Sequence, residues 1–130
     1  MQSERTDRLI RLALEEDLGT GDLTGEATVA ESSFGRGVVV ARQAMVVAGL
    51  EAFERVFTLL DERVDVQVIC ANGDRVQVDD PLVHLEGPTR SILAGERTAL
   101  NLLGALSGIA TMTRAYVDAV GSHPSRVVDT

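Results

Sequence analysis

The stretch Asn72–Gly87, NGDRVQVDDPLVHLEG, decides the fold class, because it alternates short apolar runs with turn residues. The turn sequences Asn72-Gly73-Asp74 and Asp79-Asp80-Pro81 predict strands at residues 75–78 and 82–85. Upstream, VDVQVI at 64–69 alternates valine with polar residues and predicts a half-buried strand. The three valines within FGRGVVVARQ, residues 34–43, predict another strand. The middle of the chain is therefore expected to consist mainly of short strands.

Helices are expected on both sides of these strands. Apolar residues recur at helical spacing from Leu9 to Leu18, and Gly19 is expected to end that helix. The following GTGDLTGEATVAESS, residues 19–33, is predicted to be a long connection. A second apolar stripe predicts a helix at 49–60. The region from residue 89 to about 120 is predicted to form two helices that break near Ser107-Gly108.

The strand-rich stretch resembles the barrel-sandwich hybrid of biotinyl and lipoyl domains. Those domains carry their group on a lysine, and all twelve basic residues of this chain are arginine. A carrier function and any chemistry that needs a side-chain amine are therefore excluded for this chain.

Charge and composition exclude further classes of function. The formal net charge is −8 and aromatic residues make up 3% of the chain, which argues against nucleic-acid binding. No apolar run is long enough to span a bilayer, and the N-terminus does not resemble a signal peptide. We expect a cytoplasmic protein that binds neither nucleic acid nor membrane.

The most suggestive candidate for ligand binding is Arg97, in the helical segment GERTALN. Its neighbours at helical spacing are Leu93, Ala94, Leu100 and Asn101, so it projects from an uncharged surface. An arginine in this position either pairs with an acid such as Glu96 or binds an anionic ligand. The local pattern leaves both alternatives open.

Other polar residues favour structural roles. Asp17 and Asp22 bracket a glycine-rich segment and could bind a cation, but such residues are more often caps or turn formers. His84 is expected to be a hydrogen-bonded structural histidine within a strand, and His123 a solvated loop residue. Cys70, the single cysteine, is expected in the core. No spacing suggests a zinc site or a nucleophile relay.

Four segments, in order, carry a family resemblance: ALEEDLGTGDLT (13–24), ARQAMVVAGLEAFERVF (41–57), GPTRSILAGERTALNLLGALSGIAT (87–111) and VVDT (127–130). Together they resemble quinolinate phosphoribosyltransferase. The resemblance implies an α+β fold with an N-terminal α/β-hammerhead-like domain that contains a barrel-sandwich hybrid. Helices and the first strand of a truncated α/β barrel would follow. Residues 1–112 would form the N-terminal domain, and residues 113–130 would begin the barrel.

The resemblance also implies a reaction. Quinolinate and phosphoribosyl pyrophosphate would give nicotinate mononucleotide, pyrophosphate and carbon dioxide, with magnesium. Arg97 matches an arginine that reaches a substrate carboxylate across the interface of a homodimer. Thr130 matches the threonine that opens a substrate-binding segment, at the end of a barrel strand where sites are expected.

The remaining motif residues of that family, including the arginine and lysine expected after Thr130, are absent from this sequence. We therefore expect this chain alone to lack transferase activity, with unknown catalytic residues and with magnesium ligands outside it. Two alternatives remain: a molybdenum-transport-associated paralogue of the same fold, and a non-catalytic dimerisation module that uses the apolar helix face from Ile92 to Met112.

Overall fold

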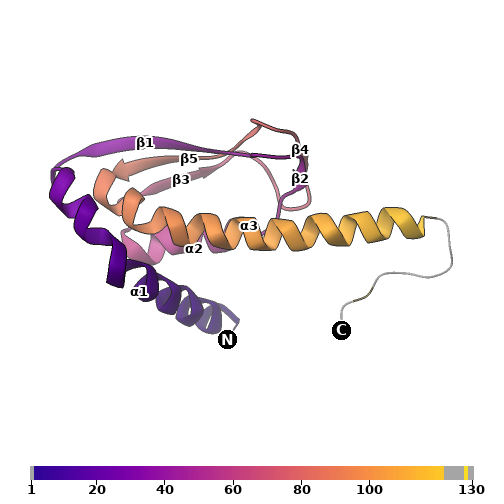
Figure 1. The fold of residues 1–130 in the computed structure, drawn as a ribbon, viewed down its shortest axis with the longest axis horizontal. Coiled ribbons are helices and arrows are strands. Elements are labelled where there is room, and N and C mark those ends of the chain that lie inside the picture. Colours follow the sequence, from indigo (N-terminus) through magenta and orange to yellow (C-terminus); the bar gives the residue numbers. More distant parts are fainter. Residues whose placement is uncertain (1, 122–127, 129–130) are drawn as a thin grey trace.

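The computed structural model describes residues 2–121 and residue 128, with side-chain placement for residues 4–19, 29–121 and 128. Figure 1 shows the sheet lying alongside a long helix, with the two other helices on the same side as that helix. The elements in chain order are α1 (Gln2–Thr28), β1 (Phe34–Val40), β2 (Met45–Val46), α2 (Leu50–Leu60), β3 (Asp65–Val68), β4 (Arg75–Val76), β5 (Pro81–Pro88) and α3 (Thr89–Val120). This mixture of helices and short strands confirms the predicted α+β class.

The strands form two antiparallel groups. β5 is the central strand of a three-stranded sheet in the order β1-β5-β3, and β2 pairs with β4 in a separate two-stranded ribbon. Val38 of β1 and Gln67 of β3 lie on either side of His84 of β5. The strand predicted at 75–78 is shorter than expected, because Asp80 binds the backbone N–H of Gln77 and turns the chain there.

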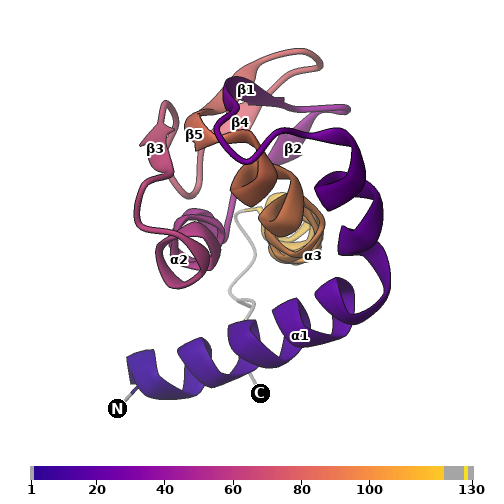
Figure 2. The same ribbon diagram turned by 90° about the vertical axis from the view of Figure 1, so that its left-hand side faces the viewer.

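The core lies between the helices and one face of the three-stranded sheet. α2 is amphipathic and buries Leu50, Phe53, Val56 and Phe57. The rings of Phe53 and Phe57 contact each other with centroids 5.5 Å apart. Burying each large apolar side chain contributes roughly 1.5–3 kcal/mol. β5 supplies buried Val83 and Leu85, so His84 and Glu86, which alternate with them, lie on its other, exposed face. The helices lie on one side of the sheet (Figure 2).

The prediction that the first helix ends at Gly19 is wrong. α1 continues to Thr28, through most of the predicted connection, and changes direction along its length (Figure 2). A glycine costs a helix only about 1 kcal/mol, which tertiary contacts can offset. One such contact follows the helix, where the Arg90 guanidinium donates a hydrogen bond to the carbonyl of Val29 at 2.8 Å.

The predicted break near Ser107-Gly108 is also wrong, because α3 is a single helix from Thr89 to Val120. The Ser107 hydroxyl is within hydrogen-bond distance of both the backbone N–H and the carbonyl of Ala48, at 3.1 Å each. Such tertiary bonds offset the low helix propensity of this segment. The predicted domain boundary between residues 112 and 113 falls inside α3 and stays a prediction. The predicted strand at 126–130 lies largely outside the described residues.

Candidate functional site

The side of α3 that carries Arg97 is fixed by the opposite side, which is buried. Gly95 lies so close to α2 that a Cβ atom on it would come within 2.8 Å of the Phe57 ring. Thr98, Ala99 and Leu103 are buried as well. Because successive helical residues turn by about 100°, Arg97 projects away from this packed side. It is exposed in the structure.

Arg97 forms no hydrogen bond or ion pair with any residue whose side chain the structure describes. By contrast, five other arginines form ion pairs with carboxylates: Arg36, Arg55, Arg63, Arg75 and Arg114. The alternative in which Arg97 pairs with Glu96 is therefore not observed. A guanidinium without a carboxylate partner keeps all its donors available for an anion.

An apolar groove, which we call the α3 groove, runs beside the same face of α3. It has a volume of about 550 Å³. Its lining includes Val40, Met45 and Leu82 on one side and Leu100, Gly104, Gly108 and Met112 of α3 on the other. Leu100 and Gly104 follow Arg97 by three and seven residues, so they share its side of the helix. Arg97 therefore projects from the helix face that borders the groove.

Arg42 also lines the α3 groove and was not singled out from the sequence. It lies just after β1, is exposed, and forms no ion pair with the described residues. It is the one charged residue among those that line the groove. Its position directly after a run of valines was the only local sign, since its proximity to Leu100 of α3 depends on the tertiary fold.

Asp17 has a structural partner. The Thr98 hydroxyl of α3 donates a hydrogen bond to the Asp17 carboxylate of α1 at 2.5 Å. The side chain of Asp22 lies outside the described residues, as do His123 and Thr130. Among the described residues, no group of three or more histidine, cysteine or acidic side chains is arranged to hold a metal ion.

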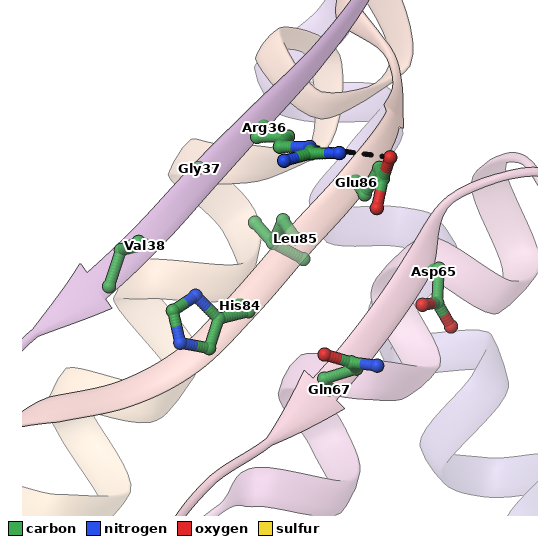
Figure 3. Close-up of a pocket in the computed structure, with 8 residues that line it drawn as sticks. All are labelled: Arg36, Gly37, Val38, Asp65, Gln67, His84, Leu85 and Glu86. Atoms are coloured by element: carbon green, nitrogen blue, oxygen red, sulfur yellow. Dashed lines mark hydrogen bonds and ion pairs between the residues drawn. The ribbon is translucent and has the colours of Figure 1, made fainter.

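A second hollow, which we call the sheet-face hollow, lies on the face of the sheet that points away from the helices (Figure 3). It has a volume of about 510 Å³ and is lined by Arg36, Asp65, Gln67, His84, Glu86 and their neighbours. The Arg36 guanidinium contacts the Glu86 carboxylate at 3.4 Å. His84 is exposed there and has no hydrogen-bond partner among the described residues. The expectation of a hydrogen-bonded structural histidine is therefore wrong.

Cys70 packs against the core and is partly buried, as expected for a structural residue. Its thiol is within 3.7 Å of the carbonyl oxygen of Leu82, and burial raises the pKa of the thiol. A higher pKa lowers the thiolate fraction at neutral pH, so Cys70 is a poor nucleophile.

The sequence of this chain matches a known protein family. The family described as quinolinate phosphoribosyl transferase, N-terminal domain, matches residues 22–107. This chain belongs to that family. The match spans both the GERTALN segment that carries Arg97 and the strands of the sheet, which confirms the resemblance found in the sequence. No helix in the described part of this family member is long and apolar enough to cross a membrane.

Relatives and solved structures extend the similarity over nearly the whole chain. A probable nicotinate-nucleotide pyrophosphorylase [carboxylating] from Synechocystis is 42% identical over 117 residues, which are 90% of this chain and 39% of the relative. The Mycobacterium leprae nicotinate-nucleotide pyrophosphorylase [carboxylating] is 40% identical over 93% of this chain and 44% of its own. The crystal structure of NadC from Streptococcus pyogenes superimposes with a TM-score of 0.88 and 38% identity, over 95% of this chain and 45% of that one.

The chain covers a similar fraction of each of these proteins. The nicotinate-nucleotide pyrophosphorylase from Francisella tularensis superimposes with a TM-score of 0.88 at 31% identity. It too is covered over 44% of its chain. This chain therefore spans about two fifths of the length of the curated relatives it matches.

Proposed function

We propose that this chain forms one wall of the active site of a carboxylating nicotinate-nucleotide pyrophosphorylase. The complete enzyme would convert quinolinate and phosphoribosyl pyrophosphate to nicotinate mononucleotide, pyrophosphate and carbon dioxide, in the cytoplasm. Membership of the family and the names of the relatives support this reaction. The single structural observation that carries the proposal is Arg97, which is exposed beside an apolar groove and has no carboxylate partner in the described part of the chain.

The substrates explain why an unpaired arginine suits this role. Quinolinate carries two carboxylates and the second substrate carries a polyphosphate, so the two repel each other unless cations hold them. A guanidinium can donate two parallel hydrogen bonds to one carboxylate, which fixes its orientation as well as its position. Arg97 would bind a quinolinate carboxylate, and its contribution to the rate would be positioning and charge compensation.

Arg97 would perform this role at the active site of a second copy in a homodimer. In support, the part of α3 that follows Arg97 exposes apolar residues, among them Leu100, Leu106, Ile109 and Met112. An apolar surface of this kind favours burial against protein. Residues beyond those described, Thr130 among them, would bind the remainder of the substrate.

Magnesium is expected from the resemblance alone. Among the described residues, no group of three or more histidine, cysteine or acidic side chains is arranged to hold a metal ion, so no magnesium ligand is assigned to them. No step is therefore assigned to the metal.

The proposal can be tested with two proteins. This chain alone, incubated with quinolinate, phosphoribosyl pyrophosphate and magnesium, should form no nicotinate mononucleotide. A chimaera in which residues 1–130 replace the aligned segment of the Synechocystis relative should form it. An inactive chimaera that elutes as a folded dimer would overturn the proposal, and activity of the chain alone would show that the barrel is not required.

A further inference from the structure

The hydrogen bond between Thr98 and Asp17 lies directly beside Arg97 in sequence. Thr98 is 2% exposed, and its hydroxyl donates to the Asp17 carboxylate across the interface between α3 and α1. Thr98 follows Arg97 on the helix, so the two side chains leave α3 about 100° apart. One projects into the α1 interface and the other projects outward.

Two other polar contacts of α1 and the residues just after it lie elsewhere. Arg55 of α2 binds Asp7 through two hydrogen bonds of 2.8 Å, and Arg90 binds the carbonyl of Val29. Among the hydrogen bonds of the described residues, only the one from Thr98 joins α1 to α3 at the turn that carries Arg97. Asp17 therefore holds α3 in place at the turn from which the Arg97 side chain projects.

We propose that Asp17 and Thr98 are positioning residues for Arg97, an inference that rests on the proposed function. Their hydrogen bond adds to the packing of Gly95 against Phe57 and fixes the rotation of α3 at the turn that carries Arg97. A guanidinium roughly 8 Å from the helix axis moves by about 1.4 Å when the helix rotates by about 10°. A misplacement of about 1 Å in a positioning group can lower a rate on the order of a hundredfold.

The contact needs an acceptor on α1 and does not need a negative charge. Thr98 supplies one O–H, and an amide oxygen in place of the carboxylate accepts the same bond. This separates an anchoring role from an electrostatic one, in which the Asp17 charge itself would act on Arg97. Asp17→Asn keeps the acceptor and removes the charge, whereas Thr98→Val keeps the shape of the side chain and removes the donor.

Steady-state kinetics of the chimaera test the proposal. Thr98→Val should raise the KM for quinolinate about tenfold, because a displaced Arg97 would lose one hydrogen bond to the substrate carboxylate. The KM for phosphoribosyl pyrophosphate should change less than about twofold. Thr98→Ser and Asp17→Asn should stay close to the parent. Asp7→Asn, which weakens the contact of α1 with α2, is the matched control and should leave both KM values unchanged.

A double variant separates failure of this inference from failure of the proposed function. In an Arg97→Ala background, Thr98→Val should add nothing to the KM for quinolinate, because no guanidinium is left to position. If Arg97→Ala is costly but Thr98→Val is silent or additive to it, the positioning role is overturned and the proposed function stands. If Arg97→Ala itself has no effect, or if the chimaera is inactive although it elutes as a folded dimer, the proposed function and this inference are both overturned.

Discussion

The sheet-face hollow and the α3 groove are similar in size, about 510 and 550 Å³, but they differ in charge. Arg36 in the sheet-face hollow is paired with Glu86, and Asp65 adds a second carboxylate, so one positive and two negative charges leave a net charge of −1. The α3 groove is lined by one charged residue, the unpaired Arg42, and Arg97 projects from the helix face beside it. The residues at the groove are therefore cationic, whereas those of the hollow carry a net negative charge.

This difference shows that the size of a hollow does not identify the site. The polar rows of the sheet-face hollow suit a solvated sheet face, where charges compensate each other across strands. The α3 groove combines apolar walls with Arg42, and Arg97 projects beside it; neither forms an ion pair with the described residues. Such an arrangement is expected for an anion with an aromatic ring, since the ring needs apolar contact and its carboxylates need donors.

The largest effect is expected when one arginine is removed from each of the two surfaces. In the chimaera, Arg97→Ala should lower kcat/KM for quinolinate on the order of a hundredfold, because a charged hydrogen-bonding pair with the substrate is lost. Arg36→Ala should change it less than about twofold, since that side chain is 82% exposed and its one ion pair among the described residues is with Glu86. Initial rates over a range of quinolinate concentrations measure both.

Guanidine added to the assay provides a control for Arg97→Ala. It should restore part of the lost rate if the missing donor group is the cause. Equal losses for the two variants would contradict the comparison, because they would place the sheet-face hollow in the site as well.

Arg42 tests whether the groove acts as one surface. Arg42→Ala should lower kcat/KM about tenfold, less than Arg97→Ala, because it removes a cation at the border of the groove. Raising the salt concentration should reduce the difference between parent and variant, since exposed charges are screened. If Arg42→Ala matches the parent at low salt, Arg97 acts alone and the charge of the groove has no role.

The sequence predicts the elements of this fold better than their ends. The apolar stripe of α2 and the two turns at Gly73 and at residues 79–81 were correctly placed, because each depends on residues close in sequence. The extension of α1 beyond Gly19 and the continuity of α3 at Ser107 were missed. Both depend on partners distant in sequence, such as the Ala48 backbone that binds Ser107.

The candidate site divides in the same way. Arg97 was found from its uncharged helical neighbours and from the family resemblance. Its lack of an ion pair, by contrast, depends on where every carboxylate lies in the folded chain. Arg42 carried no recognisable motif, and its place beside Leu100 follows from the packing of the segment after β1 against α3. The role of Thr98 required its contact with Asp17, which no spacing indicates.

The paired charges stabilise the fold, so the stability of the chain should depend on acid. Hydrogen bonds from Arg63 and then Ser91 hold the pKa of Asp61 well below its ordinary value of about 3.9. A carboxylate with a lowered pKa stabilises the folded state fully above that value, and the contribution is lost as the pH falls below it. The midpoint of thermal unfolding should therefore drop between about pH 5 and pH 2.5.

The matched variant is Asp61→Asn. At pH 7 it should unfold at a lower temperature than the parent, and the gap should narrow as the pH falls below about 4. If the difference in unfolding temperature between parent and variant stays constant with pH, the ionised form of Asp61 does not stabilise the fold through Arg63. Arg97→Ala should leave the unfolding temperature unchanged over the same range, because that guanidinium has no partner among the residues whose side chains the structure describes.

The smallest expected effect concerns the wall of the α3 groove itself. Gly104 lies in α3 with nothing within 4 Å of the place where a Cβ atom would be, whereas Gly95 has the Phe57 ring at 2.8 Å. Gly104→Ala should stabilise the chain by about 0.5–1 kcal/mol through helix propensity, and Gly95→Ala should destabilise it because the ring must move. Urea unfolding of the two variants measures the difference in stability.

The activity of the chimaera gives a second measurement at the same position. If Gly104→Ala is more stable than the parent but lowers the activity of the chimaera, a substrate or a second chain approaches α3 at Gly104. If it gains stability with unchanged activity, the site is confined to the arginines.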